Sequence, residues 1–256
     1  MGQLRSSRDW YEYFQRNARD RIEIPWERGA EISDAERDAI AASVQEFQLG
    51  ESSDGRRSLA IARRYAEKSG DPDYPEALTL FFREEGMHAE MLARFLGLAG
   101  LPLLTHAWRD SAFRHLRRCF NLEVLLLFLL VAELIAKVYY RALRAATRSE
   151  VLRRICSQIL RDEKPHVQFH LERLARMRRD RPRWLNRLTV EAHRILFLAV
   201  CFIVWLKHGR AMRRGGFGWR RYWRHCRREF HGAARGMDPR AYAAEDRFAV
   251  NYFFLQ

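Results

Sequence analysis

The stretches EEGMH and DEKPH, which end at His88 and His166, decide the fold of this chain. Each contains a glutamate followed three residues later by a histidine: Glu85 precedes His88, and Glu163 precedes His166. Residues three apart lie one turn apart on the same face of a helix, so the two side chains of a pair can reach one point. The two stretches therefore predict two helices that face each other across a metal centre.

The neighbouring residues predict that both pairs point inward. Steps of three and four through the two helices give one stripe of Leu78, Phe81, Glu85, His88, Leu92 and Phe95 and another of Leu152, Cys156, Ile159, Glu163, His166 and His170. Apart from the Glu and His side chains the stripes are apolar, which is typical of a helix face in a core. A buried carboxylate without a partner costs several kcal/mol, so these glutamates need a metal ion or a proton.

The helical periodicity of apolar residues, together with Gly and Pro residues that mark helix ends, predicts four long helices. We expect them at residues 34–69, from Pro75 to about Leu98, at 120–147 and at 150–177, with a polar connection at 103–118. The pattern of short, long and short loops is typical of two antiparallel helix pairs joined by a crossover. The predicted fold is all-α, a four-helix bundle with a long crossover between its second and third helices. No strand pattern competes.

A two-metal site in such a bundle takes one further carboxylate from each of the other two helices. Glu133 interrupts an otherwise apolar helix and is the candidate in 120–147. In the first helix the choice lies between Glu46 and Glu51. Facing residues lie at similar distances from their shared turn; Glu85 is about twelve residues from the turn at 70–73, Glu51 about eighteen and Glu46 about twenty-three. Spacing favours Glu51, and the choice stays open.

Several neighbours of the pairs also bear on the site. His170 follows His166 by one turn and is interpreted as a group that orients a ligand or as an extra ligand. Asp162 is expected to hold a histidine or an arginine. Tyr139 and Tyr140 are interpreted as packing residues, with a redox role as the alternative. Pro165 removes a backbone donor, so it should bend the helix or indicate that the second pair is not helical.

Composition places limits on the compartment. The chain has 256 residues, of which 48% are hydrophobic, enough for one large globular unit with appendages. Its four cysteines form no Cys-x-x-Cys pair, which argues against a zinc knuckle or a disulfide framework. The first residues lack a signal-type apolar segment. We expect a cytoplasmic protein.

The chain divides into three predicted parts: residues 1–33 laid over the bundle, the bundle at 34–177, and a helical extension at 178–256. The extension should hold helices at 185–212 and 217–234. Its apolar run from Ile195 to Leu206 is shorter than the roughly 20 residues of a membrane span. We interpret this run as a buried core helix.

Charge is concentrated toward the C-terminus. Residues 1–100 carry 14 basic and 19 acidic side chains, whereas the rest carry 32 and 13. The segment 207–228 alternates arginines with Trp219, Tyr222 and Trp223. Such a segment could contact nucleic acid, an acidic substrate or an anionic membrane surface. The alternative is a solvated helix whose tryptophans pack on the preceding helix.

Over residues 34–177 the chain resembles the ferritin-like di-iron carboxylate superfamily, which includes rubrerythrins, ribonucleotide reductase small subunits and several oxygenases. The strings FQLGE, ending at Glu51, and FREEGMH, ending at His88, are similar to bacterial ferritin-like proteins of unassigned chemistry. The resemblance implies two metal ions, iron or manganese, and a role for each of six residues. It implies that Glu51 and Glu133 are terminal ligands, that Glu85 and Glu163 are bridges, and that His88 and His166 bind one metal each.

The function expected from this site is a di-iron oxidase or oxygenase that activates dioxygen to oxidise a small organic molecule. It would need an electron donor protein and could form a homodimer. One alternative is a ferroxidase or peroxide scavenger, although rubredoxin-type cysteine pairs are absent from the sequence. Another is an RNA-modifying hydroxylase that uses the basic C-terminal part.

Overall fold

The computed structural model describes residues 4–52, 55–105 and 121–242, which are helical with no strand among them. The main helices are α1 (Ser7–Asn17), α2 (Asp34–Glu51), α3 (Arg56–Ser69), α4 (Asp73–Leu98), α6 (Leu122–Ala146), α7 (Glu150–Met177), α8 (Arg183–Arg214) and α9 (Trp219–Gly236). Side-chain caps begin several of them: Ser33 accepts a hydrogen bond from Glu36 N, Asn121 from Val124 N and Ser149 from Leu152 N. The all-α prediction is confirmed.

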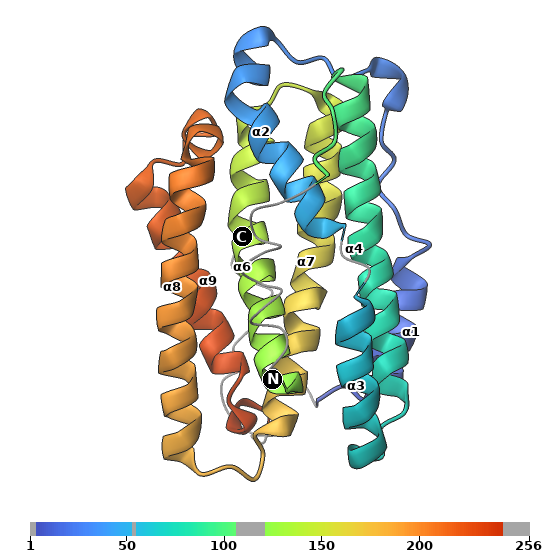
Figure 1. The fold of residues 1–256 in the computed structure, drawn as a ribbon, viewed down its shortest axis with the longest axis vertical. Coiled ribbons are helices and arrows are strands. Elements are labelled where there is room, and N and C mark those ends of the chain that lie inside the picture. The colour runs from blue at the N-terminus through green and yellow to red at the C-terminus, as the bar shows by residue number, and fades with distance from the viewer. Residues whose placement is uncertain (1–3, 53–54, 106–120, 243–256) are drawn as a thin grey trace.

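The bundle consists of α2 with α3, α4, α6 and α7. In Figure 1, α2 and α3 descend, α4 ascends, α6 also ascends, and α7 descends. Because α4 and α6 run in the same direction, the end of α4 and the start of α6 lie at opposite ends of the bundle, as the predicted crossover requires. Of the predicted connection at 103–118, only residues 103–105 lie within the described residues.

The first predicted helix, 34–69, is wrong as a single element, because the chain breaks between α2 and α3. Gly55 has φ +60°, a left-handed conformation that a helix does not contain. A Cβ at Gly55 would lie 2.4 Å from the ring of Phe82, so only glycine allows this close approach to α4. The break directly follows Glu51, the last residue of α2.

The second Glu-x-x-His pair is helical. The helix α7 runs from Glu150 to Met177 with Pro165 inside it, so the interpretation that this pair lies outside a helix is wrong. Pro165 is itself buried and lacks the N–H that would bond one turn back. The bend predicted at Pro165 stays a prediction.

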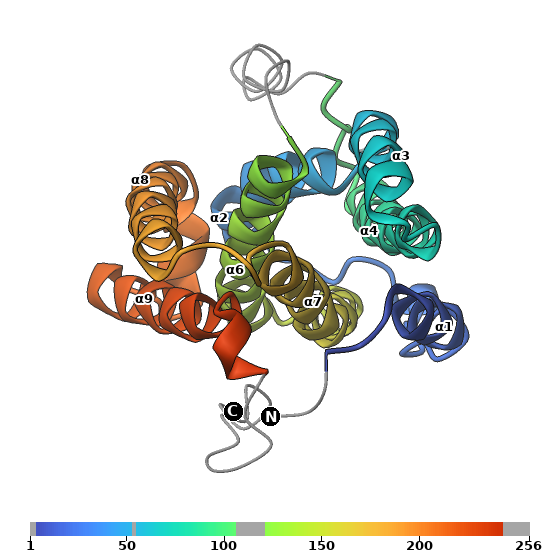
Figure 2. The ribbon, with the colours of Figure 1, turned by 90° about the horizontal axis from the view of Figure 1, so that it is seen from below.

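The N-terminal helix α1 covers the side of the bundle formed by α4 and α7 (Figure 2). Its Trp10 and Phe14 are buried, with ring centroids 5.4 and 5.3 Å from that of Phe169 in α7. The indole N–H of Trp10 donates to Glu172 at 2.9 Å. These contacts bring Asn17, at the end of α1, over the centre of the bundle.

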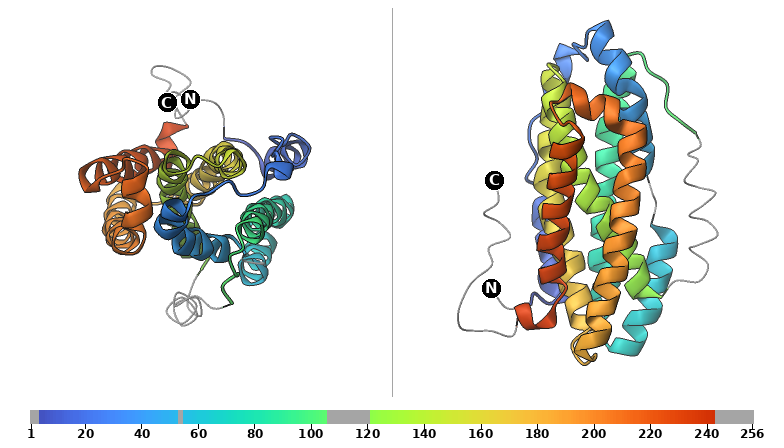
Figure 3. Two further views of the ribbon diagram at one scale, coloured as in Figure 1. Left: turned by 90° about the horizontal axis from the view of Figure 1, so that it is seen from above. Right: turned by 90° about the vertical axis from the view of Figure 1, so that its left-hand side faces the viewer.

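The helices α8 and α9 pack on the other side of α6 (Figures 2 and 3). One face of α8 is buried through His193, Phe197 and Cys201, and α9 buries Tyr222, Cys226 and Phe230. Buried and partly buried ion pairs join this side to the bundle. Glu123 of α6 accepts from Arg178 and Arg181, and Glu229 of α9 accepts from Lys137 and Arg141 of α6.

The prediction that the apolar run from Ile195 to Leu206 is a buried core segment is wrong for its outward face. Ile195 is 70% exposed, Phe202 50% and Leu206 67%. The most apolar window of α8 is long and hydrophobic enough to cross a membrane by length and composition, yet only 17% of that window is buried in the protein. Hydropathy identified an apolar helix but did not show how much of it the protein covers.

Candidate metal centre

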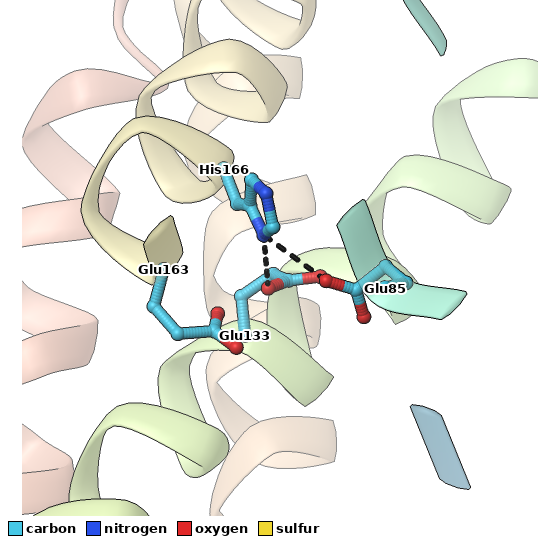
Figure 4. A group of neighbouring side chains, drawn as sticks. All are labelled: Glu85, Glu133, Glu163 and His166. Atoms are coloured by element: carbon cyan, nitrogen blue, oxygen red, sulfur yellow. Dashed lines mark ion pairs between the residues drawn. The ribbon is translucent and has the colours of Figure 1, made fainter. Parts of the chain in front are cut away.

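Six side chains from four helices meet in the bundle as two overlapping groups. One group comprises Glu85, Glu133, Glu163 and His166; the other comprises Glu51, Glu85 and His88. Within each group, one candidate ligand atom per residue lies within 4.8 Å of all the others. Figure 4 shows the first group, in which His166 faces Glu85 and Glu133. Glu85 belongs to both groups, so it lies where a bridge between two metal ions would be.

The two histidines are held by carboxylates from the opposite helix. His88 of α4 places Nε2 3.0 Å from Asp162 of α7, and His166 of α7 places Nε2 2.9 Å from Glu84 of α4. An ionised carboxylate only accepts hydrogen bonds, so Nε2–H is the donor in each pair. Each of these carboxylates directly precedes the glutamate of its own pair. This crossed arrangement fixes the orientation of both rings and leaves both Nδ1 atoms facing the centre.

A single amide from α1 connects the two carboxylates that hold the histidines. Nδ2 of Asn17 donates to Glu84 at 2.8 Å and to Asp162 at 3.0 Å. Asp162 also accepts from Gln158 at 2.7 Å. The expectation that Asp162 holds a histidine agrees with its distance of 3.0 Å from Nε2 of His88. Through Asn17, the N-terminal helix also helps to position the two carboxylates that hold the histidines.

The atoms that face the centre make no hydrogen bonds, although some of them lie close to a group of opposite charge. Among the described residues, the buried side-chain atoms without a hydrogen bond include Nδ1 of His88, Nδ1 of His166, Oε1 of Glu85 and both carboxylate oxygens of Glu163. His166 Nδ1 lies 3.1 Å from Glu85 Oε1, and His88 Nδ1 lies 3.6 Å from the same atom. Buried polar groups are normally paired. A cluster of unpaired nitrogen and oxygen atoms directed at one another fits the ligand set of hard or borderline divalent cations such as iron and manganese.

The buried carboxylates differ in how burial and their neighbours change their pKa values. Burial raises the pKa of Glu51 well above its usual value, and the negative charge of Glu85 adds to the effect. Burial also raises the pKa of Glu163, with Glu133 as the main charged neighbour. In contrast, although burial opposes it, the neighbouring imidazoles of His166 and His88 lower the pKa of Glu85. Without metal, protons shared among these groups balance the buried negative charge.

The two histidines hold some of the protons that balance the buried negative charge. Burial lowers the pKa of His88, but Asp162 and Glu85 outweigh burial and raise it to about 10. The pKa of His166 is likewise raised, through Glu133, Glu84 and Glu85. A metal ion at either Nδ1 would replace the proton there while Nε2–H stays bonded to its carboxylate. Two divalent cations would also match the formal charge of the four glutamates.

The structure distinguishes the two candidates from the first helix. Glu51 is buried and lies in the group with Glu85 and His88, and the hydroxyl of Tyr140 donates to it at 2.7 Å. Glu46 lies 3.7 Å from His208 of α8 and is directed away from the cluster. The interpretation of Tyr140 as a packing residue is therefore incomplete. Tyr139 does pack, with its ring stacked 3.4 Å from that of Phe47.

His170 is fully buried beside the first group. Its Nε2 lies 4.0 Å from Glu133, and neither ring nitrogen has a hydrogen bond among the described residues. Burial, with the nearby charge of His166, lowers its pKa to about 3, so the ring is neutral. It has the geometry of an imidazole that could approach a metal ion or orient Glu133. Both interpretations of His170 stay predictions.

Three residues at the site were not singled out from the sequence. The carboxylate of Glu84 was visible as the residue before Glu85, in the same place as Asp162 before Glu163, and this repetition was the available signal. Asn17 and Gln158 had no signal, because their role depends on how α1 packs on the bundle. Glu163 belongs to one group only, so its implied role as a bridge stays a prediction.

Comparison with solved structures places this arrangement in a known fold. The chain is similar to a mutant R2-like ligand-binding oxidase with an anaerobically reconstituted Mn/Fe cofactor, with a TM-score of 0.63 over 92% of this chain and 94% of that one. The fold is ferritin-like. The expected resemblance is thereby confirmed at the level of fold, while the 15% sequence identity leaves the chemistry open.

Two other comparisons found nothing: no protein-family model matches the chain, and no characterised protein matches its sequence. The ferritin-like chain nevertheless carries carboxylate and histidine groups that could bind two metal ions, as predicted. Its three-part division and its cytoplasmic location stay predictions.

Proposed function

We propose that this ferritin-like protein is a two-metal oxidase, with iron or one manganese and one iron at the centre, that uses dioxygen to oxidise an organic substrate. The observation that carries the proposal is the pair of ligand groups that share Glu85 and direct unpaired atoms at one another. The similar R2-like ligand-binding oxidase holds a Mn/Fe cofactor, which supports the same class of metal here.

The residues present fit that cofactor. Four carboxylates and two imidazoles from α2, α4, α6 and α7 match the ligand set of carboxylate-rich two-metal sites in bundles. When bound, such a pair of metals supplies electrons to dioxygen and an oxidising centre for the substrate. His88 and His166 are expected to hold one metal each, with Glu85 between the metals.

The surrounding side chains would control protons and water. Asp162 and Glu84 keep the histidines in the tautomer that offers Nδ1 to the centre. The Tyr140 hydroxyl bonds to Glu51 and holds a proton beside it in a site from which bulk water is excluded. Exclusion of bulk water would protect an oxidising centre from side reactions.

The test is to add ferrous iron anaerobically to the metal-free protein, remove excess iron, and then expose it to oxygen. We expect about two irons per chain that are oxidised together, a spectrum of coupled ferric ions, and no continued turnover of added ferrous iron. The Glu85→Ala variant is the control. It should neither retain two irons per chain nor show the spectrum of coupled ferric ions. Sustained oxidation of excess ferrous iron would instead indicate a ferroxidase, and a single isolated iron would contradict the proposal.

The organic substrate, the electron donor protein and a homodimer remain predictions. The RNA-modifying alternative predicts that short single-stranded RNA binds in a salt-dependent manner and increases oxygen consumption by the reduced protein. Oxygen consumption that RNA leaves unchanged would remove that alternative.

A further inference from the structure

The helix α8 has a second apolar face that the protein does not cover. Its inner row is buried through His193, Phe197 and Cys201. On the opposite side, steps of four and seven connect an outer row of exposed large side chains, Trp184, Leu188, Ile195, Phe202 and Leu206. Trp184 is 67% exposed and Leu188 60%. A helix that is apolar on both sides is expected inside a core or against lipid, and only one side of α8 meets the core.

This outer row runs along one edge of the molecule. Helix α8 has 32 residues, which corresponds to a length of about 48 Å. Figure 3 (right) shows α8 and α9 side by side on this edge. Trp219, which begins α9, extends the apolar surface because its ring centroid lies 6.1 Å from that of Phe202 and 5.5 Å from that of Trp205.

Arginines surround the apolar row. Arg183, Arg187 and Arg194 are exposed at the start of α8, and Arg210 and Arg213 continue the outer row beyond Leu206. On α9 the exposed residues include Arg220, Arg221 and Arg224. The only acidic residue of α8, Glu191, is exposed and lies 3.2 Å from Arg194. Residues 178–242 carry 17 basic and 4 acidic side chains, a net charge of +13.

A cleft at the start of α8 offers a place for an anionic group. It has a volume of about 190 Å³ and is lined by four arginines, Arg178, Arg183, Arg187 and Arg240, and by two acids, Glu191 and Asp238. Arg178 is fully buried, and its Nη2 has no hydrogen-bond partner among the described residues. The exposed Trp184 and Leu188 lie on the same first turns of α8 as Arg183 and Arg187.

We infer that the outer face of α8, with the adjoining start of α9, binds the surface of a membrane that contains anionic phospholipids. Apolar side chains would enter the boundary between headgroups and acyl chains, and the flanking arginines would contact phosphates, as in helices that lie in a membrane interface. Because the inner face of α8 is packed on the bundle, the helix would lie along the membrane and not span it.

The same observations argue against other partners. A second copy of the chain would bring two arginine-rich surfaces together, which is unfavourable. Nucleic acid would use the arginines but would leave the exposed leucine, isoleucine and phenylalanine side chains of the outer row without a role. An anionic membrane accounts for both the apolar and the basic residues.

The test uses the full chain and co-flotation with vesicles. We expect binding to vesicles of phosphatidylglycerol with phosphatidylcholine, much weaker binding to phosphatidylcholine alone, and release at high salt. The double variant Leu188→Ser, Leu206→Ser should bind anionic vesicles at least about tenfold more weakly. Both leucines are more than half exposed, so circular dichroism and iron content should be unchanged.

A matched control changes two exposed leucines elsewhere: Leu98, 42% exposed, and Leu103, 50% exposed. The variant Leu98→Ser, Leu103→Ser should float like wild type. Equal loss in both double variants, or no vesicle binding by wild type, would overturn the inference. Binding of the wild type to single-stranded RNA but not to vesicles would also overturn it. A wild-type dimer that becomes monomeric in the Leu188→Ser, Leu206→Ser variant, but not in the control variant, would do the same. Vesicle binding that appears only after residues 243–256 are deleted would also overturn it.

Discussion

The carboxylates on the two sides of α6 have opposite kinds of partner. Toward α8 and α9, Glu123 and Glu229 accept hydrogen bonds from arginine and lysine side chains. Toward α4 and α7, Glu85 and Glu163 have buried oxygens with no hydrogen bond among the described residues. The first side is neutralised by arginine and lysine, whereas the second shares protons among its histidines and glutamates, and metal ions could take the place of those protons. Burial of charge therefore points to a metal site where the counter-charge is a displaceable proton and not a fixed arginine or lysine.

The pKa values follow the same division. Burial opposes ionisation of Glu123, but Arg181 and Arg178 more than offset it and lower the pKa of that carboxyl group. Burial and neighbouring carboxylates raise the pKa of Glu163. The arginine-paired side contributes to the free energy of folding, and the unpaired side to metal binding. Variants on the two sides should therefore separate stability from metal content.

The largest effect is expected from the removal of either histidine ligand. His88→Ala and His166→Ala should each lower the bound iron from about two ions per chain to about one or fewer, since each ring serves one of the two groups. Metal analysis after anaerobic loading measures this. Two irons retained in both variants would show that the Nδ1 atoms are not ligands.

The next effect concerns the carboxylates that hold the histidines. Glu84→Gln and Asp162→Asn keep the shape of the side chain but remove its charge, and we expect metal affinity to fall by about 10–100-fold. Competition with a coloured chelator measures the affinity. A matched change at the exposed Glu90, Glu90→Gln, should have no effect; affinities equal to wild type in Glu84→Gln and Asp162→Asn would contradict the crossed arrangement.

Acid should weaken metal binding continuously as the pH falls. In the metal-free protein, the raised pKa of His88, about 10, keeps a proton on Nδ1 at neutral pH, and the raised pKa of Glu163 favours a proton there as well. Metal binding must release these protons, so affinity rises with pH by about tenfold per released proton per pH unit. Calorimetry in buffers of different ionisation enthalpy counts the protons; a count of zero would contradict this prediction.

The smallest effect on metal is expected on the arginine-paired side. Glu123→Gln should leave the iron content unchanged but lower the free energy of unfolding by about 2 kcal/mol, because it leaves the buried Arg178 without its carboxylate. The depressed pKa of Glu123 means that this stabilisation is present above the unfolded pKa near 4.5 and is lost as pH falls. Denaturant titration at neutral and acid pH measures both, and a loss of iron in this variant would remove the distinction between the two sides.

The sequence predicted the parts of the site that depend on local spacing. Glu85 with His88 and Glu163 with His166 could be identified because helical periodicity alone places each pair on one face. Glu133 was visible as a carboxylate in an apolar helix. The pairing of His88 with Asp162 and of His166 with Glu84 was not predictable, since it depends on the relative height of two helices far apart in the chain.

Two errors have the same origin in tertiary contacts. The break after Glu51 was signalled by Ser52 and Gly55, but its necessity comes from the close approach of Gly55 to Phe82. The apolar run of α8 was recognised, but periodicity cannot tell which of two apolar faces the protein covers. Local pattern therefore predicted the ligands better than it predicted the surfaces around them.

The central proposal is that Glu85, which belongs to both ligand groups, would help to hold two metal ions. The most direct measurement is the metal content of Glu85→Ala beside that of Glu123→Gln, both loaded anaerobically with ferrous iron and checked for folding by circular dichroism. The account predicts almost no iron in folded Glu85→Ala and about two irons per chain in Glu123→Gln. Two irons retained in folded Glu85→Ala would contradict it.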